Sequence, residues 1–121
     1  MEAALIDRVH AVIAESLAAP RSAMAGDPLL IAELGASSLD FVDILFLLEA
    51  EFQVELQQVN FDFLASLGLS PEEAYVGPHL SPLARTKLLR WLPRLPEDRP
   101  VAPTELILFA SPRTFAAIIE D

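Results

Sequence analysis

The chain has 121 residues, of which 53% are hydrophobic, and it contains no cysteine. A chain of this size can form one ordinary domain with a buried core, and the absence of thiols excludes disulfides and thiolate metal sites. The formal net charge of −10 argues against binding to nucleic acid, which requires a basic face.

Neither a leader peptide nor a membrane span is predicted. Residues 1–18, MEAALIDRVHAVIAESLA, include charged side chains that interrupt any signal-peptide core. No apolar run approaches the ~20 residues that are needed to cross a bilayer. Because the lack of cysteine also fits a reducing compartment, we expect a soluble, cytoplasmic protein. We also expect it to be a monomer.

The acidic residues are concentrated in residues 23–84. This segment has no Lys or Arg, and its ten acids are Asp27, Glu33, Asp40, Asp43, Glu49, Glu51, Glu55, Asp62, Glu72 and Glu73. Two interpretations are open: a solvated surface that keeps the protein soluble, or a docking surface that steers basic partners toward it.

The first helix is expected over residues 3–18, where apolar residues recur at helical spacing. His10 lies beside this apolar stripe and has no second ligand nearby, so we interpret it as an ordinary surface residue and predict no metal site. Pro20 and the stretch AGDP open a loop, and residues 28–36 could include one short turn of helix.

A second helix is expected over residues 38–52. Ser37 has the N-cap position, and Asp40 has the position of the capping-box acid three residues later. Beyond Phe52, β-branched and polar residues weaken the helical pattern.

Residues 53–110 are less regular, because seven of the ten prolines divide them into short pieces. Ser-Pro pairs predict helix starts at Ser70, Ser81 and Ser111. The helix that begins at Pro82 is expected to reach about Leu92. The stretch ELILFA, residues 105–110, is predicted as a short strand or an extended buried run.

The predicted helix 38–52 has two apolar stripes. One stripe is the expected core face, and it consists of Phe41, Ile44, Leu45, Leu48 and Phe52. The other could belong to a helix that is buried on all sides, or it could bind a partner. Because acidic residues flank it, we favour docking through Leu39, Val42, Asp43, Phe46 and Glu49.

Ser37 and Ser38 stand at the amino end of this helix. No Ser-His-Asp arrangement and no G-x-S-x-G motif accompanies them, so a hydrolase is a distant third interpretation. Ser37 is assigned the plain role of helix cap. Ser38 lies in the first turn, where the helix dipole and free N–H groups favour an anionic substituent such as a phosphate ester.

At these residues the sequence resembles the acyl carrier protein family, whose signature is Leu-Gly-x-Asp-Ser-Leu followed by an acidic, apolar helix. Here the stretch reads LGASSLDFVDILFLLEAEF, residues 34–52, without a gap. The resemblance implies that Ser38 carries 4′-phosphopantetheine, attached by a separate phosphopantetheinyl transferase. Its thiol would hold an acyl group as a thioester, so that the serine is a tether and the protein is no enzyme.

The resemblance also implies partners: an acyl-loading ligase or acyltransferase, and a ketosynthase or other acyl-processing enzymes. It implies a role in fatty-acid, specialised lipid or polyketide biosynthesis, and the acid-rich helix favours these over peptide carriers. The open alternative is a carrier-fold adaptor that is never modified and acts as a protein-interaction module. Ser37 replaces the usual Asp of the family signature, which removes one charge beside the attachment site.

The expected fold is all-α: a helical bundle like that of acyl carrier proteins, in one domain over residues 1–121, with an atypical insertion at about 57–103. We expect a bundle core of Leu5, Val9, Ile13, Leu34, Ile44, Leu48, Phe52, Phe115 and Ile118. The insertion helix should pack on this bundle through Leu88 or Trp91, with its bases outward or near acids. Its bulk would exclude enzymes built for compact carriers.

Overall fold

The computed structural model describes residues 3–56 and 61–120. Its helices and strands, with η for 3₁₀-helices, are α1 (Ala3–Leu17), η1 (Arg21–Met24), α2 (Ser38–Phe52), η2 (Ala65–Leu67), α3 (Pro71–Ala74), β1 (Tyr75–Val76), β2 (His79–Leu80), α4 (Pro82–Leu88), η3 (Pro103–Phe109) and α5 (Pro112–Glu120). The described fold is therefore helical apart from one small ladder, as the sequence predicted. None of these helices is long and apolar enough to span a lipid bilayer.

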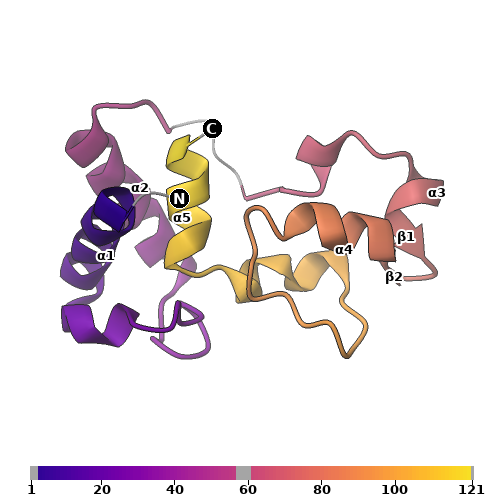
Figure 1. The fold of residues 1–121 in the computed structure, drawn as a ribbon, viewed down its shortest axis with the longest axis horizontal. Helices are drawn as coiled ribbons and strands as arrows, with labels where there is room; N and C mark the ends of the chain where they lie inside the picture. Colours follow the sequence, from indigo (N-terminus) through magenta and orange to yellow (C-terminus); the bar gives the residue numbers. More distant parts are fainter. Residues whose placement is uncertain (1–2, 57–60, 121) are drawn as a thin grey trace.

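The chain forms two lobes, which lie side by side in Figure 1. The first, here called the bundle, consists of residues 3–56 and 110–120 and contains α1, α2 and α5. The second lobe consists of residues 61–109 and contains α3, β1, β2, α4 and η3. The second lobe is thus inserted in the chain between α2 and α5.

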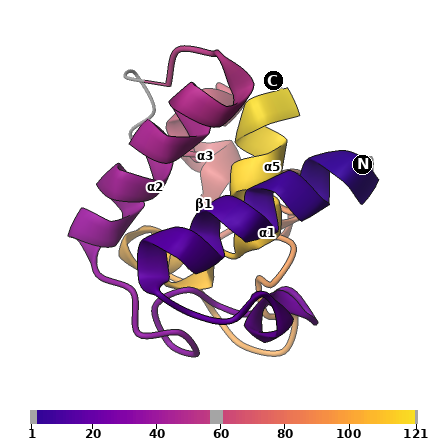
Figure 2. The same cartoon turned by 90° about the vertical axis from the view of Figure 1, so that its left-hand side faces the viewer.

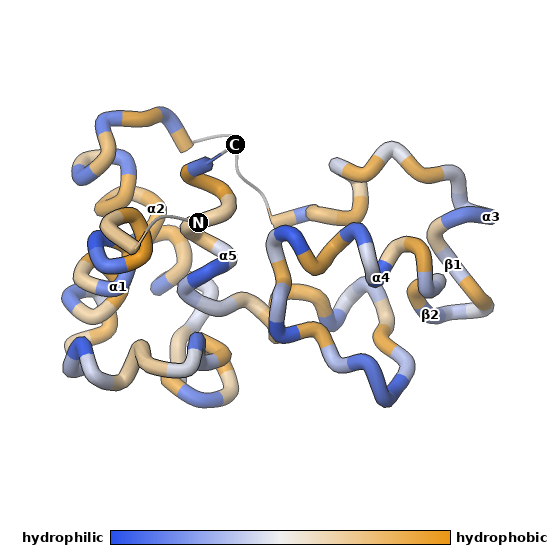
Figure 3. The backbone as a smooth tube through the Cα atoms, in the orientation of Figure 1, coloured by the Kyte–Doolittle hydropathy of each residue, from blue (hydrophilic) through white to orange (hydrophobic). Residues whose placement is uncertain are grey.

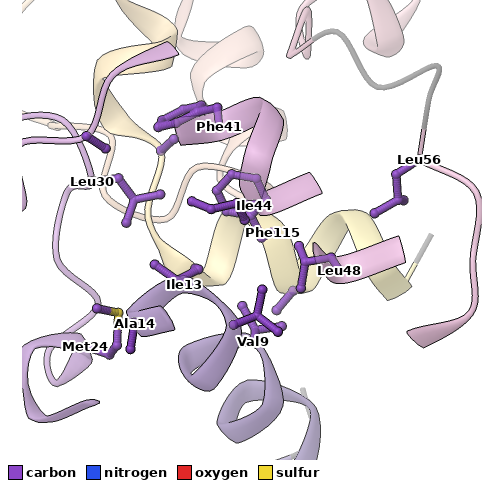
Figure 4. Close-up of a cluster of buried hydrophobic side chains, with 14 residues drawn as sticks. Val9, Ile13, Ala14, Met24, Leu30, Phe41, Ile44, Leu48, Leu56 and Phe115 are labelled. Atoms are coloured by element: carbon purple, nitrogen blue, oxygen red, sulfur yellow. The ribbon is translucent and has the colours of Figure 1, made fainter. Parts of the chain in front are cut away.

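In the bundle, α1 packs against both α2 and α5 (Figure 2). Its core is formed by large apolar side chains that point inward from all three helices (Figure 4). Of the predicted core, Val9, Ile13, Ile44, Leu48 and Phe115 are buried. The other four, Leu5, Leu34, Phe52 and Ile118, are half-buried and pack against the same cluster. The helical periodicity of the sequence therefore identified the faces that meet.

Residues of the second lobe build a hydrophobic core of their own. Its buried members are Phe63, Leu80, Ala84, Leu88, Leu92, Leu95, Val101, Leu106 and Phe109. The hydropathy-coloured tube shows apolar positions distributed through the second lobe as well as the bundle (Figure 3). The prediction that Leu88 or Trp91 packs on the bundle was wrong, because both side chains belong to this second cluster. Residues from several of the short pieces between the prolines, among them Leu80, Leu95 and Val101, share this cluster with Leu88 of α4.

Three local predictions in this region also need correction. Helix α4 ends at Leu88 and not near Leu92. The Trp91 N–H and the Leu92 N–H both donate to the Leu88 carbonyl, at 3.0 and 2.9 Å, which closes a tight turn. Pro93 follows directly, and a proline disfavours helical backbone in the residue before it.

The stretch ELILFA does not form the predicted strand or extended run, because residues 105–109 lie in η3 and Ala110 is the C-cap of that helix. Pro103 suits the first helical position, and the Glu105 carboxylate accepts the Ala102 N–H at 2.9 Å. The spacing of three between Leu106 and Phe109 brings both side chains into the second core, since a 3₁₀-helix has three residues per turn.

The ladder between β1 and β2 was not predicted. It is a two-residue hairpin in which Val76 pairs with His79 and Tyr75 pairs with Leu80. Gly77 opens the turn with a φ of 62°, a left-handed conformation that such hairpins favour and that glycine adopts without strain.

Candidate functional site

The loop before α2 is fastened to the start of α5. Asp27 adopts a φ of 56°, and its carboxylate accepts the Ser111 hydroxyl at 2.7 Å and the Arg113 N–H at 2.9 Å. The Leu30 N–H donates to the Ala110 carbonyl at 3.0 Å. Since Arg113 is in the first turn of α5, Asp27 satisfies an N–H group that the helix itself leaves without an acceptor.

Tight turns then bring the chain to the amino end of α2. Residues 28–36 contain the short helical turn considered possible there, because the Glu33 N–H donates to the Leu29 carbonyl at 2.9 Å and the Gly35 N–H to the Ile31 carbonyl at 3.2 Å. A 3₁₀-helix that was not predicted, η1, lies earlier in the chain. The Ala36 N–H donates to the Leu30 carbonyl at 2.9 Å, and the side chain of Ala36 is buried. Gly35, with a φ of 72°, permits this reversal. The reversal leaves Ser37 and Ser38 at the protein surface.

Ser37 forms the N-cap of α2. The Ser37 hydroxyl accepts the Asp40 N–H at 3.3 Å, while the Asp40 carboxylate accepts the Ser37 N–H at 2.7 Å. The same carboxylate accepts the Ser37 hydroxyl at 3.2 Å. Both halves of a capping box are therefore present, and the carboxylate of Asp40 is directed toward Ser37.

Ser38 is the first residue of α2, and it is exposed. Within the described ranges, no side chain makes a hydrogen bond to the Ser38 hydroxyl, and neither His10 nor His79 bonds to either serine. A serine needs an adjacent base to act as a nucleophile in its own right. The geometry instead presents an accessible hydroxyl at the positive end of a helix dipole.

An exposed apolar stripe runs along α2 beyond Ser38. The side chains of Leu39, Val42 and Phe46 are 79%, 48% and 61% exposed. On the opposite side of the same helix, Phe41, Ile44 and Leu48 are buried in the bundle core. Burial on all sides, the alternative considered for this helix, is therefore wrong.

The two acids predicted to flank this stripe already have partners within the bundle. Asp43 accepts the Ser16 hydroxyl at 2.6 Å and remains exposed. Glu49 is half-buried and accepts the Leu56 N–H at 2.7 Å, so that it fixes the chain that leaves α2. Both carboxylates lie beside the apolar stripe, but Glu49 also has a structural function that the sequence pattern did not indicate.

Comparison with known proteins identifies the family. The chain is 42% identical to an acyl carrier protein of Campylobacter jejuni subsp. doylei over 64 residues, which are 53% of this chain and 83% of that protein. It is 31% identical to the acyl carrier protein of Thermotoga maritima, covering 79% of it, and 34% identical to that of Campylobacter curvus, covering 83%. The chain belongs to the acyl carrier protein family. No protein-family model and no solved structure matches it.

This carrier family member is considerably longer than its matched region. Since 64 of its 121 residues align, 121 − 64 = 57 residues lie outside the alignment with the Campylobacter jejuni subsp. doylei protein. The second lobe is a segment of comparable size that lies in the chain between two helices of the bundle. It has its own buried cluster, against which Leu29 and Ile118 of the bundle also pack. These residues therefore form a folded lobe, and that they are an insertion relative to the family stays a prediction.

An arginine of the second lobe reaches the loop before Ser38, a contact that sequence reasoning missed. The Arg94 guanidinium donates to the Asp27 carbonyl at 2.7 Å and to the Glu33 carboxylate at 3.1 Å. The hydrogen bond from the Leu29 N–H, and after it the one from Arg94, holds the pKa of Glu33 below its ordinary value. The residues in this contact are more than 60 positions apart, so no local pattern could reveal it. The sequence indicated only that the insertion's bases could lie near acids.

Proposed function

We propose that Ser38 is the attachment site for 4′-phosphopantetheine and that the protein delivers acyl groups to partner enzymes. The main support is the exposed Ser38 hydroxyl at the first position of α2, without a base, in a member of the acyl carrier protein family. When attached, 4′-phosphopantetheine supplies a terminal thiol that holds the acyl group as a thioester. The protein itself needs no catalytic group, because loading and transfer take place in its partners.

The residues around Ser38 fit a phosphodiester at this position. The first turn of α2 has N–H groups without helical acceptors and a positive dipole end, both of which favour an anion. The Asp40 carboxylate, the nearest negative group in the sequence, already accepts two hydrogen bonds from Ser37. Ser37 and Asp40 thus hold the helix end in place while Ser38 remains accessible to a phosphopantetheinyl transferase.

Partner enzymes would dock on the exposed stripe of α2, through Leu39, Val42, Asp43, Phe46 and Glu49. Exposed apolar side chains that are flanked by acids favour a partner surface with an apolar centre and basic residues around it. The bundle has few bases: its described residues include ten acids and only Arg8, Arg21 and Arg113. The negative electrostatic potential of this surface would accelerate the approach of partners with basic surfaces. The expected partners are the transferase, a loading ligase or acyltransferase, and a ketosynthase or other acyl-processing enzymes.

The same acidic stripe favours fatty-acid, specialised lipid or polyketide chemistry over peptide assembly. Within the chain, the bundle would perform the carrier function, and the second lobe would restrict which partners can approach. The lobe is attached beside the loop that precedes Ser38, through Arg94, so that its position relative to the docking face is constrained.

Intact mass spectrometry after treatment with coenzyme A and a broad-specificity phosphopantetheinyl transferase tests the proposal. Wild type should gain the mass of one phosphopantetheine, Ser38→Ala should gain none, and Ser37→Ala should still be modified. Ser37→Ala is the matched control, because it removes the neighbouring hydroxyl and weakens only the cap, by about 1 kcal/mol. A folded wild type that gains no mass would refute the carrier function and favour the unmodified adaptor.

A further inference from the structure

Three aromatic rings meet behind the helix that bears Ser38. Phe41 of α2 and Phe115 of α5 are buried with ring centroids 5.7 Å apart. The ring of Phe61 lies 5.4 Å from Phe41 and 5.8 Å from Phe115, at steep angles to both. These are favourable tilted and edge-on contacts, so the half-buried Phe61 completes a triangle of rings and packs against the bundle core.

Phe61 differs from the other two rings because it comes from outside the helices. It is the first described residue of the second lobe, and it packs against the cores of both lobes. Its φ is 60°, a left-handed conformation that is rare for a bulky side chain and costs roughly 1–3 kcal/mol. The contacts of the ring therefore hold Phe61 in a backbone conformation that it would not adopt alone.

The ring of Phe61 packs against the first buried ring on the helix that bears Ser38. Phe41 is one helical turn beyond Ser38 on α2, and the half-buried ring of Phe61 contacts Phe41 from the second lobe. The cluster around these rings is apolar, and its buried members include Ile44 and Leu48. Only another apolar group could replace the ring at no cost in hydrogen bonds.

We propose that Phe61 is a specificity-determining residue that limits the length of acyl chain the bundle can bury. This inference rests on the proposed function, since it concerns cargo attached through Ser38. Short acyl groups leave the ring in place, whereas longer chains find their space filled and remain outside the core. Removal of the ring opens that space to an apolar chain.

The test compares butanoyl, octanoyl and dodecanoyl forms of the protein, loaded after intact mass has shown phosphopantetheine on Ser38. In wild type, Tm should stay the same along this series within experimental error. In Phe61→Ala, Tm should rise by about 5–10 °C from butanoyl to octanoyl, as additional CH₂ groups are buried. Phe61→Leu keeps much of the apolar packing, and its Tm should rise less from butanoyl to octanoyl. This variant keeps the proposal testable if Phe61→Ala fails to fold.

Phe63→Ala is the matched control. Phe63 is also an aromatic residue of the second lobe, 6.0 Å from Phe61, but it belongs to the second core and stacks on Trp91. Its removal should lower stability without creating any dependence of Tm on chain length. Equal dependence in wild type and Phe61→Ala would overturn the proposal. A shift in the emission of Trp91, the sole tryptophan, with longer chains in wild type would also overturn it, because Phe61 would then be displaced.

A separate measurement on the unmodified protein distinguishes this inference from the carrier function. Benzene should raise the Tm of unmodified Phe61→Ala, whose missing ring leaves an apolar cavity, and should leave wild type unchanged. If Ser38 takes no phosphopantetheine but benzene binds to Phe61→Ala as expected, the carrier function is refuted. The result would still show that the Phe61 ring fills a space behind α2 that an apolar molecule can occupy. If Ser38 is modified and Phe61→Ala binds neither benzene nor longer chains, the role of Phe61 alone is refuted.

Discussion

Because each lobe has its own hydrophobic core, we predict that a cavity in one core lowers the stability of that lobe more than the stability of the other. Leu88 in the second lobe and Leu48 in the bundle are both 0% exposed, so the same substitution can be made in each core. Replacing a fully buried leucine by alanine costs about 2–5 kcal/mol, through lost burial and the cavity that remains. A loss of this size is a large fraction of the stability of a small unit.

Leu88→Ala should therefore destabilise the second lobe while the bundle remains folded. Trp91 fluorescence reports on the second lobe, because the indole stacks on Phe63. Its thermal transition should fall by roughly 10 °C or more, given that 1 kcal/mol shifts the Tm of a small domain by about 4–8 °C. Hydrogen exchange of α2 amides reports on the bundle and should change little. Ser38 should still accept phosphopantetheine.

Leu48→Ala is the reciprocal experiment. It should increase exchange in α2 and reduce modification of Ser38, with a smaller effect on Trp91. The reasoning would be refuted if Leu88→Ala lowered both transitions by the same amount. It would also be refuted if that variant lost protection in α2, since the second lobe would then be part of one cooperative core with the bundle.

Three further predictions concern the candidate site. The double variant Phe46→Ala with Asp43→Lys should lower kcat/KM for the modification of Ser38 about ten-fold or more, without loss of helicity. The control Val76→Ala changes an exposed apolar residue of the second lobe and should leave kcat/KM unchanged. An unchanged kcat/KM in the double variant would show that the transferase docks elsewhere. Asp27→Ala should lower the unfolding free energy in urea by about 1–2 kcal/mol, since it removes two acceptors at the start of α5, and Asp27→Asn should lower it less. The pKa of Glu33 is lowered on folding, so its stabilising effect is present above the ordinary carboxyl pKa and is lost as the pH falls through the lowered value. Arg94→Gln should weaken this acid-induced loss of stability without abolishing it, because the Leu29 hydrogen bond remains; an identical pH profile would contradict the role of Arg94.

Much of the bundle could be predicted because its signals are local. Helical spacing identified the core faces of α1 and α2, and Ser37 with Asp40 marked the start of α2 within a few residues. The Ser-Pro pairs correctly gave the starts of α3, α4 and α5. The exposed stripe that includes Leu39 and Phe46 could also be predicted, because the sequence of α2 has more apolar positions than one buried helix face contains.

The second lobe could not be predicted to the same extent, because its structure depends on distant contacts. Its core joins Phe63, Leu80 and Val101, which come from separate short segments. Leu106 and Phe109 fit a buried strand as well as a 3₁₀-helix until their neighbours are known. The positive φ of Phe61 has no signal in the sequence, since the pattern contains no glycine there.

Both ends of the second lobe return to the bundle. Phe61 packs against the rings of both Phe41 and Phe115, and the chain comes back at Ala110, whose carbonyl accepts the Leu30 N–H. A segment with its own core and with both attachment points on one body can be replaced without rerouting the rest of the chain. The second lobe could therefore be replaced by a foreign binding domain inserted between α2 and α5. The bundle would then hold that domain close to Ser38.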